Sequence, residues 1–481
     1  MNQTLILSIF AIYTLLIFFI TWLTSRKAND SAFYQGNRRS PWYVVAYGMI
    51  GASLSGVTFM SVPGWVKDTQ FSYMLVVLGY MVGYAVVATI LLPLYYRLNL
   101  TSIYTYLQQR FGNGTYKTGA SFFLLSRTIG ASLRMFLVVY VLHLFVFQGW
   151  GIPFWAVGFI FVLLVLAYTF KGGIKTIVWT DTLQTTFMLL AVVISVVLIG
   201  KEMGWSLKEI FSRVKESEYS TMIVTDWTDK RFFLKQFLSG IFITIAMTGL
   251  DQEMMQKNLS CRNLKEAQKN MFTFSGTLLV INFLFLILGA VLIMYAQSNN
   301  ISIAETDRLF PDIAINHLGT LAGVIFLIGL ISAAYPSADG ALTSLTTSFC
   351  IDILELDKRD ITDQEKKRIR YTTHGLLALL FLLLIIFFRY INDSAVIDKL
   401  FTIAGYTYGP LLGFFSFGLF TRIKVYDKAI PFVGIVSPLI TYILDQNSVS
   451  WFGGYKFGFE LLIVNGLITF FGLWLCRIRQ K

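Results

Sequence analysis

Charged residues are scarce in this chain. Of its 481 residues only 14% are charged, while 56% are hydrophobic. A soluble domain would carry about a quarter of charged residues. Short segments that alternate apolar and polar residues are also lacking, which excludes a membrane β-barrel. Instead, near-continuous apolar runs of about 20 residues recur, long enough for a helix to cross the hydrocarbon of a bilayer. The expected fold class is therefore an all-α polytopic membrane protein.

Residues that carry catalysis and metal binding are few and scattered. The three cysteines (Cys261, Cys350, Cys476) show no disulfide or metal-ligand spacing, and the three histidines stand alone. No paired carboxylates accompany a histidine, and no nucleophile motif is found. These absences argue against an enzyme. No soluble catalytic domain is appended to the apolar segments.

Acidic residues are outnumbered, which leaves a net charge of +12. The basic residues gather in every second connection, so the excess is a topology signal and does not indicate nucleic acid. We expect the N-terminus outside and the C-terminus in the cytoplasm, in a bacterial inner membrane. The first segment lacks a leading positive charge and a cleavage site, so it is expected to be a retained span. The thirteen expected spans lie near 3–25, 41–66, 70–97, 115–148, 153–170, 175–200, 233–256, 271–297, 320–352, 368–392, 394–420, 429–445 and 458–476.

The span 41–66 contains "YGMIGASLSGVTFMSVPGW", in which glycines, hydroxyls and Pro63 interrupt an apolar run. One interpretation is structural, because small residues let membrane helices pack closely and serines bond back to their own backbone. The density of hydroxyls beside Pro-Gly favours a second interpretation. In that view the helix unwinds and lines a cavity.

The stretch "SAAYPSADGALTSLTTSFCID", from Ser332 to Asp352, is the second unusual segment. Pro336 cannot donate to the carbonyl four residues back, which leaves the Ser332 oxygen free. A free carbonyl beside the Ser337 hydroxyl suits an alkali cation. Asp339 is costly at this depth and is a functional candidate, with a structural hydrogen bond as the alternative. We expect this helix, like the span 41–66, to lose its regular backbone midway through the bilayer.

Three further charges fall within predicted spans. Asp181 lies one to two turns inside its span, and its position could be interfacial. Arg134 lies near the middle of the span 115–148, and a buried guanidinium wants a carboxylate. That partner could be an internal aspartate such as Asp181 or the carboxylate of a substrate, and both stay open. For Arg127 a structural pairing is favoured.

Together, and in this order, these segments resemble the sodium/solute symporter family. "GASLSGVTFMSVPG" is similar to its broken first core helix, and "GGIKTIVWTDTLQ" to the entry of the fifth. "GLDQEMMQKNLSCRN" resembles the DQ-x3-QR signature with Lys257 in place of arginine, and the stretch from Ser332 resembles the eighth core helix. The resemblance implies a LeuT-type fold of two inverted five-helix repeats with flanking helices. One transporter domain, 1–481, would then comprise a leading helix and inner loop 1–40, a first repeat 41–200, an extracellular loop 201–232, a second repeat 233–420 and two flanking helices 421–481.

The same resemblance implies cation sites. The main sodium site would take carbonyls of Gly51, Leu54 and Ala333 and the Ser337 hydroxyl. Pro336 stands where the family has a second hydroxyl, and we hypothesise that the Ser332 carbonyl substitutes in part.

A second sodium site, present in some members, matches Asp181 but uses hydroxyls where this chain has Asp339 and Gly340. The number of cations, and the choice of sodium or a proton at Asp181 or Asp339, therefore stays open.

In members that carry sialic acids, an arginine on the third core helix holds the substrate carboxylate. Arg134 resembles that arginine, and Ser53, Ser55 and Thr58 resemble substrate-facing residues. The implied function is Na⁺-coupled symport of a small organic solute, such as a sialic acid or another carboxylate, by alternating access. The expected partners are that solute and the lipid bilayer but no nucleic acid, with a monomer expected and an oligomer left open. The alternatives are a proton-coupled or weakly sodium-coupled sugar symporter and a transport-type solute sensor.

Overall fold

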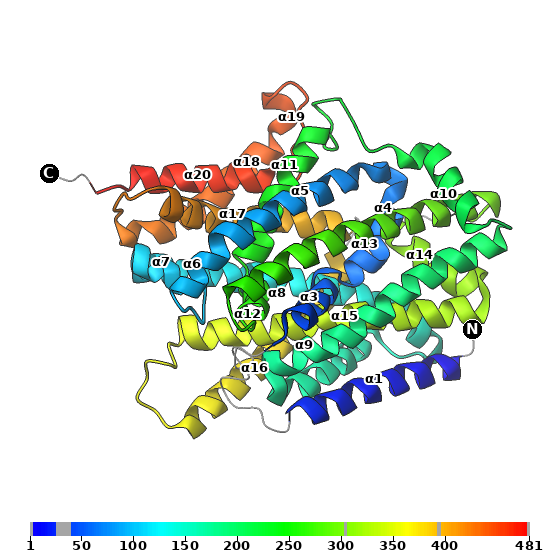
Figure 1. Ribbon diagram of the computed structural model, residues 1–481, viewed down its shortest axis with the longest axis horizontal. Coiled ribbons are helices and arrows are strands. Elements are labelled where there is room, and N and C mark those ends of the chain that lie inside the picture. The colour runs from blue at the N-terminus through cyan, green and yellow to red at the C-terminus, as the bar shows by residue number, and fades with distance from the viewer. Residues whose placement is uncertain (1–2, 26–39, 303–304, 392–395, 479–481) are drawn as a thin grey trace.

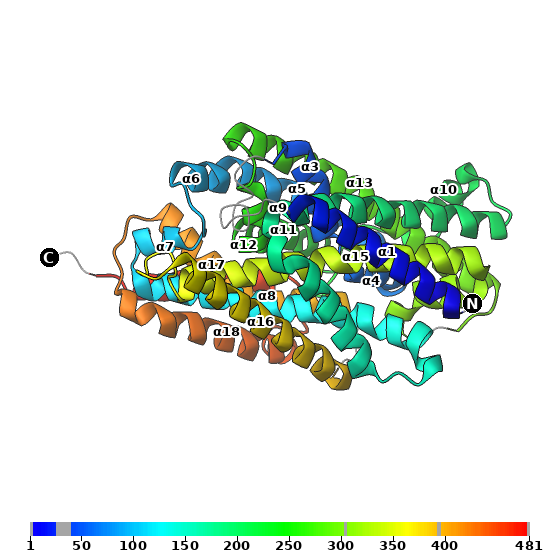
Figure 2. The same ribbon diagram turned by 90° about the horizontal axis from the view of Figure 1, so that it is seen from below.

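A computed structural model describes residues 3–25, 40–302, 305–391 and 396–478, with backbone alone at 3–7, 24–25 and 170–175. Most helices run along the long axis of the molecule (Figures 1 and 2). Helix α1 (Gln3–Ser25) starts at one end, and α20 (Leu461–Leu475) finishes toward the other. The all-α class predicted from the sequence is confirmed. The inner loop expected within 1–40 lies largely outside the described residues.

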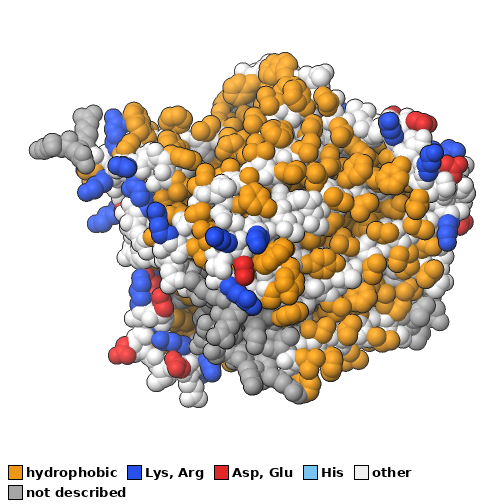
Figure 3. Space-filling model, viewed as in Figure 1, with side chains coloured by type: hydrophobic (Ala, Val, Ile, Leu, Met, Phe, Trp, Pro, Cys, Tyr) orange, Lys and Arg blue, Asp and Glu red, His pale blue; other side chains and the backbone are white. Residues whose placement is uncertain are grey.

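The surface of the bundle is apolar over its middle. Figure 3 shows hydrophobic side chains over most of one face, with charged side chains mostly toward the two ends of the long axis. Large side chains such as Leu15, Leu376 and Phe432 are exposed. An apolar surface of this extent is stable only against another apolar phase. The bundle is therefore a multi-pass membrane protein.

The first half of the chain begins with two short helices in line. A sharp change at Gln70, whose φ of 55° is positive, separates the second of them from the next helix. The helices of this half are α3 (Trp42–Ser53), α4 (Gly56–Thr69), α5 (Tyr73–Val86), α6 (Leu92–Arg97), α7 (Thr105–Arg110), α8 (Asn113–Leu142) and α9 (Phe154–Glu202).

Helix α9 has 49 residues. At 1.5 Å per residue this run would be about 73 Å long, more than twice the roughly 30 Å of bilayer hydrocarbon. Its apolar residues form two segments, Phe154–Thr169 and Thr176–Glu202. The run therefore accounts for the two spans expected at 153–170 and 175–200. The total of thirteen crossings remains a prediction.

The second half follows a charged segment that contains helix α10 (Leu207–Glu216). Ser206 and Glu209 form a capping box that fixes the start of this helix. The remaining helices are α11 (Phe233–Thr244), α12 (Gln252–Asn258), α13 (Leu264–Ser298), α14 (Leu309–Asp312), α15 (Gly319–Ser348), α16 (Asp363–Ile391), α17 (Val396–Phe420), α18 (Ile430–Gln446) and α19 (Ser448–Trp451).

Two close contacts organise the interior. Helix α15 packs along α9, and every residue from 329 to 348 is buried. Helices α5 and α11 meet through glycines: a Cβ added to Gly79 would lie 3.0 Å from the Cα of Gly240, and one added to Gly240 would lie 3.0 Å from the Cα of Val76. Since no side chain separates them, the two backbones are in direct contact.

Candidate functional site

The first helix break lies between α3 and α4. Leu54 (φ −89°, ψ 86°) and Ser55 (φ −82°, ψ 177°) interrupt the helical backbone. Gly56 lets α8 approach, because a Cβ at this position would lie 2.5 Å from a methyl group of Val138. The last carbonyls of α3 therefore end without a following turn to supply their donors. The unwound backbone predicted for the span 41–66 is present.

A second break lies between α11 and α12, which are bent by 70°. The chain leaves a π-helical turn at Gly249, and the Asp251 side chain caps α12 by accepting from the Met254 N–H at 3.1 Å. Tyrosine hydroxyls bind two consecutive carbonyls at the break: Tyr95 donates to Gly249 at 2.8 Å and Tyr104 to Leu250 at 2.9 Å. The freed carbonyls are therefore satisfied by side chains of other elements.

The prediction that the helix through Pro336 loses its regular backbone is wrong. Helix α15 runs without interruption from Gly319 to Ser348. Pro336 still removes the donor to the Ser332 carbonyl, but packing on all sides holds the helix straight enough to keep its pattern. The two unwound elements are thus the spans 41–66 and 233–256.

A central cavity of about 90 Å³ lies beside the first break. All four residues expected to face the substrate, Ser53, Ser55, Thr58 and Arg134, line it. The rest of the wall is mixed: tyrosines of α5, polar groups of α11–α13 and apolar side chains of α17. Among these are Tyr73, Tyr80, Tyr84, Thr248, Asn282 and Phe401.

The two buried arginines of α8 have different surroundings. Arg127 forms an ion pair with Glu253 and lies 3.9 Å from Asp251, so the structural pairing expected for it is present. Arg134 is 9% exposed, and no carboxylate of the described residues lies within 4.0 Å of it. Its Nε has no hydrogen-bond partner there either. Arg134 therefore presents to the central cavity a guanidinium that no carboxylate of the described residues pairs directly.

Asp181 does not pair with an arginine. Its Oδ2 accepts from the Lys257 ammonium at 2.7 Å, and both side chains are buried. Asp339 lies in the same region and accepts from the Tyr168 hydroxyl at 2.7 Å. The packing of α9 against α3 and α15 encloses Asp181 completely, and its depth in the membrane stays a prediction.

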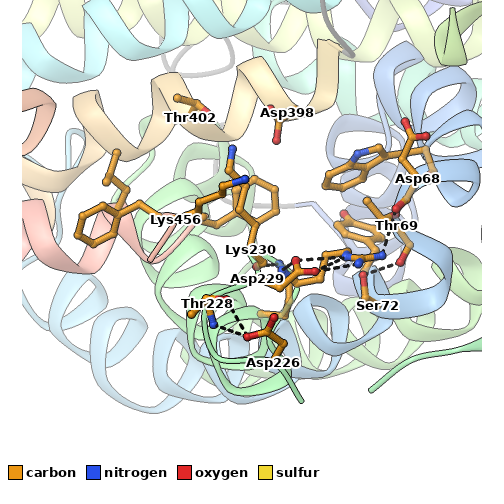
Figure 4. A pocket seen from close by; sticks show the side chains of 18 of the residues that line it. Asp68, Thr69, Ser72, Asp226, Thr228, Asp229, Lys230, Asp398, Thr402 and Lys456 are labelled. Carbon is orange, nitrogen blue, oxygen red and sulfur yellow. Dashed lines mark hydrogen bonds and ion pairs between the residues drawn. The ribbon is translucent and has the colours of Figure 1, made fainter. Parts of the chain in front are cut away.

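A larger cavity of about 740 Å³ lies next to the central one, at the end of the bundle that carries the 201–232 segment. Asp398 and Thr402 of α17 face Lys230 and Lys456 across it (Figure 4). Tyr73 lines both cavities, and its ring lies 6.5 Å from that of Phe401. We call this larger cavity, lined by the residues labelled in Figure 4, the entrance vestibule. Aromatic side chains separate it from the central cavity.

Comparison with known proteins decides the family. The model of the sodium:solute symporter family matches residues 33–425. The chain belongs to this family.

Two curated symporter sequences align with most of the chain. The sodium/sialic acid symporter NanT of Aliivibrio fischeri is 23% identical over 459 residues, covering 93% of this chain and 89% of NanT. SiaT of Proteus mirabilis, also a sodium/sialic acid symporter, is 22% identical and covers 93% and 91%. A solved substrate-bound, outward-open Na⁺-coupled sialic acid symporter shares the fold with a TM-score of 0.83 at 20% identity, over 98% of this chain and 97% of that one. The predicted family, LeuT-type fold and sodium coupling are confirmed at the level of the family.

Of the residues expected at the main sodium site of this symporter, Gly51 of α3 lies against α9 and α15. A Cβ at Gly51 would lie 3.6 Å from the Pro336 ring and 3.4 Å from the Asp181 carbonyl. The Ser337 hydroxyl is buried, and no described residue bonds it. Carbonyls near a helix break and an unsatisfied hydroxyl are donor types that suit an alkali cation. Leu54, at the end of α3, and Ala333, on α15, are also buried.

Reasoning from the sequence missed two features of this symporter: the second helix break and the buried charged cluster on α12. Gly249 followed by Asp251 is a helix stop followed by an N-cap, which could have located the second break. Glu253 and Lys257 are four residues apart on α12 and face the same buried cluster, at 3.8 Å from each other. Their partners on α8 and α9 are distant in the chain, so no local pattern identifies them.

Proposed function

We propose that this protein is a transporter, and not an enzyme or a sensor, that carries a small carboxylate-bearing solute together with Na⁺ by alternating access. The observation that carries the proposal is the Arg134 guanidinium, which lies buried at the central cavity with no carboxylate of the described residues within 4.0 Å. A buried charge of this kind is costly unless a counter-ion arrives. A solute carboxylate supplies that counter-ion, and Ser53, Ser55 and Thr58 supply hydroxyls beside it.

Na⁺ would be held by the carbonyls of Gly51, Leu54 and Ala333 and by the Ser337 hydroxyl. An ion there supplies a positive charge that joins the first broken helix to α15 and so favours the substrate-ready arrangement. Solute would enter through the vestibule and pass the aromatic side chains of Tyr73 and Phe401. We place the N-terminus and the vestibule outside a bacterial inner membrane, with the C-terminus in the cytoplasm.

The first candidate solute is a sialic acid, because NanT and SiaT carry that name over nearly the whole length of this chain. Uptake of radiolabelled N-acetylneuraminate into proteoliposomes tests it. Accumulation should require an inward sodium gradient and should fail when choline replaces sodium. Uptake driven equally well by a pH gradient without sodium would point to proton coupling instead.

A smaller monocarboxylate is the second candidate. The central cavity of about 90 Å³ is well below the roughly 300 Å³ at which pockets for drug-sized ligands begin. Sodium-coupled monocarboxylate transporter 2 of Mus musculus is 24% identical over 407 residues, which cover 82% of this chain. Competition of lactate with N-acetylneuraminate in the same vesicles separates the two: the true solute should inhibit at the lower concentration.

A further inference from the structure

The vestibule has the volume of a ligand-binding site. It encloses about 740 Å³, which is within the roughly 300–1,000 Å³ found for pockets that hold small molecules. The central cavity, at about 90 Å³, is well below that range. Of these two cavities, the vestibule alone has room in this conformation for a solute as large as a sugar acid.

Two lysines face this volume from one wall. Lys230 and Lys456 belong to separate loops, and Figure 4 shows both side chains across the cavity from Asp398. Among the described lining residues only Arg231 and Asp229 form an ion pair, so no carboxylate lies within 4.0 Å of either lysine ammonium. Both ammonium groups are therefore available to a solute carboxylate.

Hydrogen bonds hold the two lysine-bearing loops together. The Lys456 N–H donates to the Thr228 carbonyl at 3.3 Å, and the Lys235 ammonium donates to the Lys456 carbonyl at 3.2 Å. The Gln236 amide donates to the Lys230 carbonyl at 2.9 Å. Because the main chain is tied at both lysines, less ordering is needed when a solute binds between them.

The remaining lining suits a solute with several hydroxyl groups. Trp65 offers an aromatic surface, and the rings of Tyr73 and Phe459 pack against it at 5.8 and 5.9 Å. Five described aspartates line the cavity against three cationic side chains. Carboxylates accept hydrogen bonds from hydroxyls, whereas they repel an anion that has few hydroxyls to donate. The lining therefore favours a polyhydroxylated acid over a simple monocarboxylate.

We infer that the vestibule is a sodium-independent binding site for a polyhydroxylated carboxylate, in which Lys230 and Lys456 bind the carboxylate and aspartates such as Asp398 accept the hydroxyls. The inference deepens the proposed function and rests on it for the acidic nature of the solute. None of the four residues expected to hold Na⁺ lines this cavity, so binding here should not need the ion. The site holds the solute outside Tyr73 until the central cavity opens.

The test measures binding in the absence of sodium. Equilibrium dialysis of radiolabelled N-acetylneuraminate against the purified full chain, in choline chloride, should show saturable binding. This binding should persist in Arg134→Met, because Arg134 lines the central cavity and not the vestibule. Loss of the binding in Arg134→Met would place it in the central cavity and overturn the inference.

Failure of the site and failure of the proposed function give different results. No saturable binding without sodium would overturn the vestibule site, while sodium-driven uptake into proteoliposomes would continue to support the transport function. Saturable sodium-free binding without any sodium-driven uptake would support the site and overturn the coupling.

A double variant tests the two lysines. Lys230→Met/Lys456→Met removes both ammonium groups, which are exposed and so are not needed for folding. Each exposed ion pair contributes at most about fivefold in affinity, so the double variant should weaken sodium-free binding by about 3- to 25-fold. Lys208→Met, at an exposed lysine of α10, is the matched control and should bind as the wild type does. An unchanged affinity in the double variant would refute the role of the lysines.

Competition in the same sodium-free assay tests the class of solute. Gluconate, a carboxylate with several hydroxyls, should displace N-acetylneuraminate. Lactate, which has a single hydroxyl, should displace much less at the same concentration. Equal displacement by the two would show that the aspartates do not select for hydroxyls, and it would overturn the assignment of a polyhydroxylated solute.

Discussion

Removing the two buried arginines of α8 should affect thermal stability differently: Arg127→Met should lower it, and Arg134→Met should not. Arg127→Met breaks an ion pair with Glu253 and leaves that carboxylate buried near Asp251. Arg134→Met removes a buried cation that has no carboxylate of the described residues within 4.0 Å. The two positions lie seven residues apart on one helix, so each serves as the control for the other.

The magnitudes follow from the two environments. Breaking a buried ion pair by removing one partner costs about 3–5 kcal/mol, so Arg127→Met should lower the melting temperature strongly. Arg134→Met should leave the solute-free protein as stable as the wild type or more stable. A hydrogen bond to a charged group contributes about 1.5–3 kcal/mol, so the same variant should lose roughly 10- to 150-fold in solute affinity.

Differential scanning fluorimetry of the detergent-purified proteins, with and without N-acetylneuraminate and with lactate in parallel, measures both effects. The wild type should gain stability with the true solute in the presence of sodium, and Arg134→Met should not. If Arg134→Met lowers the solute-free melting temperature as much as Arg127→Met does, then Arg134 is a structural residue. The carboxylate-recognition argument would then be refuted.

Three further predictions follow from local geometry. Pro336→Ser adds a hydroxyl at a sodium-ligand position of the family, so the sodium concentration for half-maximal thermal shift should fall about tenfold, or about 1.4 kcal/mol; an unchanged value would show that position 336 does not reach the ion. On α13, Gly289→Ala should destabilise the protein by about 1–3 kcal/mol, since its Cβ would lie 2.9 Å from Pro63 Cα. The control Gly276→Ala should stabilise it slightly, because a Cβ there has nothing within 4 Å. Equal melting temperatures of the two variants would contradict the packing of α13. In the vestibule, Arg231 holds the pKa of Asp229 below its usual value through hydrogen bonds. The pair stabilises the folded protein by at most about 1 kcal/mol. This stabilisation is complete above the unfolded pKa of about 3.9 and is lost as the pH falls through the lower pKa of the folded state. The stability difference between wild type and Arg231→Met should therefore disappear in acid, and a difference that grows in acid would reverse the sign of the argument.

The helices could be predicted from the sequence because a helix that crosses a bilayer must be apolar over about 20 consecutive residues. The ranges near 115–148 and 271–297, for example, correspond to α8 and α13 within several residues. The break at Leu54 and Ser55 was predictable because glycines, hydroxyls and Pro-Gly are concentrated there. The uninterrupted course of α15 was not, because the response of a helix to Pro336 depends on neighbours that the local sequence does not reveal.

The candidate site was partly predictable for the same reason. The family resemblance and the depth of Arg134 in its span predicted a substrate-facing set of Ser53, Ser55, Thr58 and Arg134, and all four line one cavity. The Lys257–Asp181 contact joins residues 76 positions apart. Its existence follows from how α12 turns after the second break, which no periodicity in the chain encodes.

The glycine contact between α5 and α11 constrains how the molecule can change shape. Because their main chains touch at Gly79 and Gly240, the two helices cannot slide past each other without opening a void or colliding. They should therefore rotate together as one rigid body, about a pivot at another place in the molecule. A bulkier residue at this junction should consequently force the two helices apart and displace the cavity wall that both of them line.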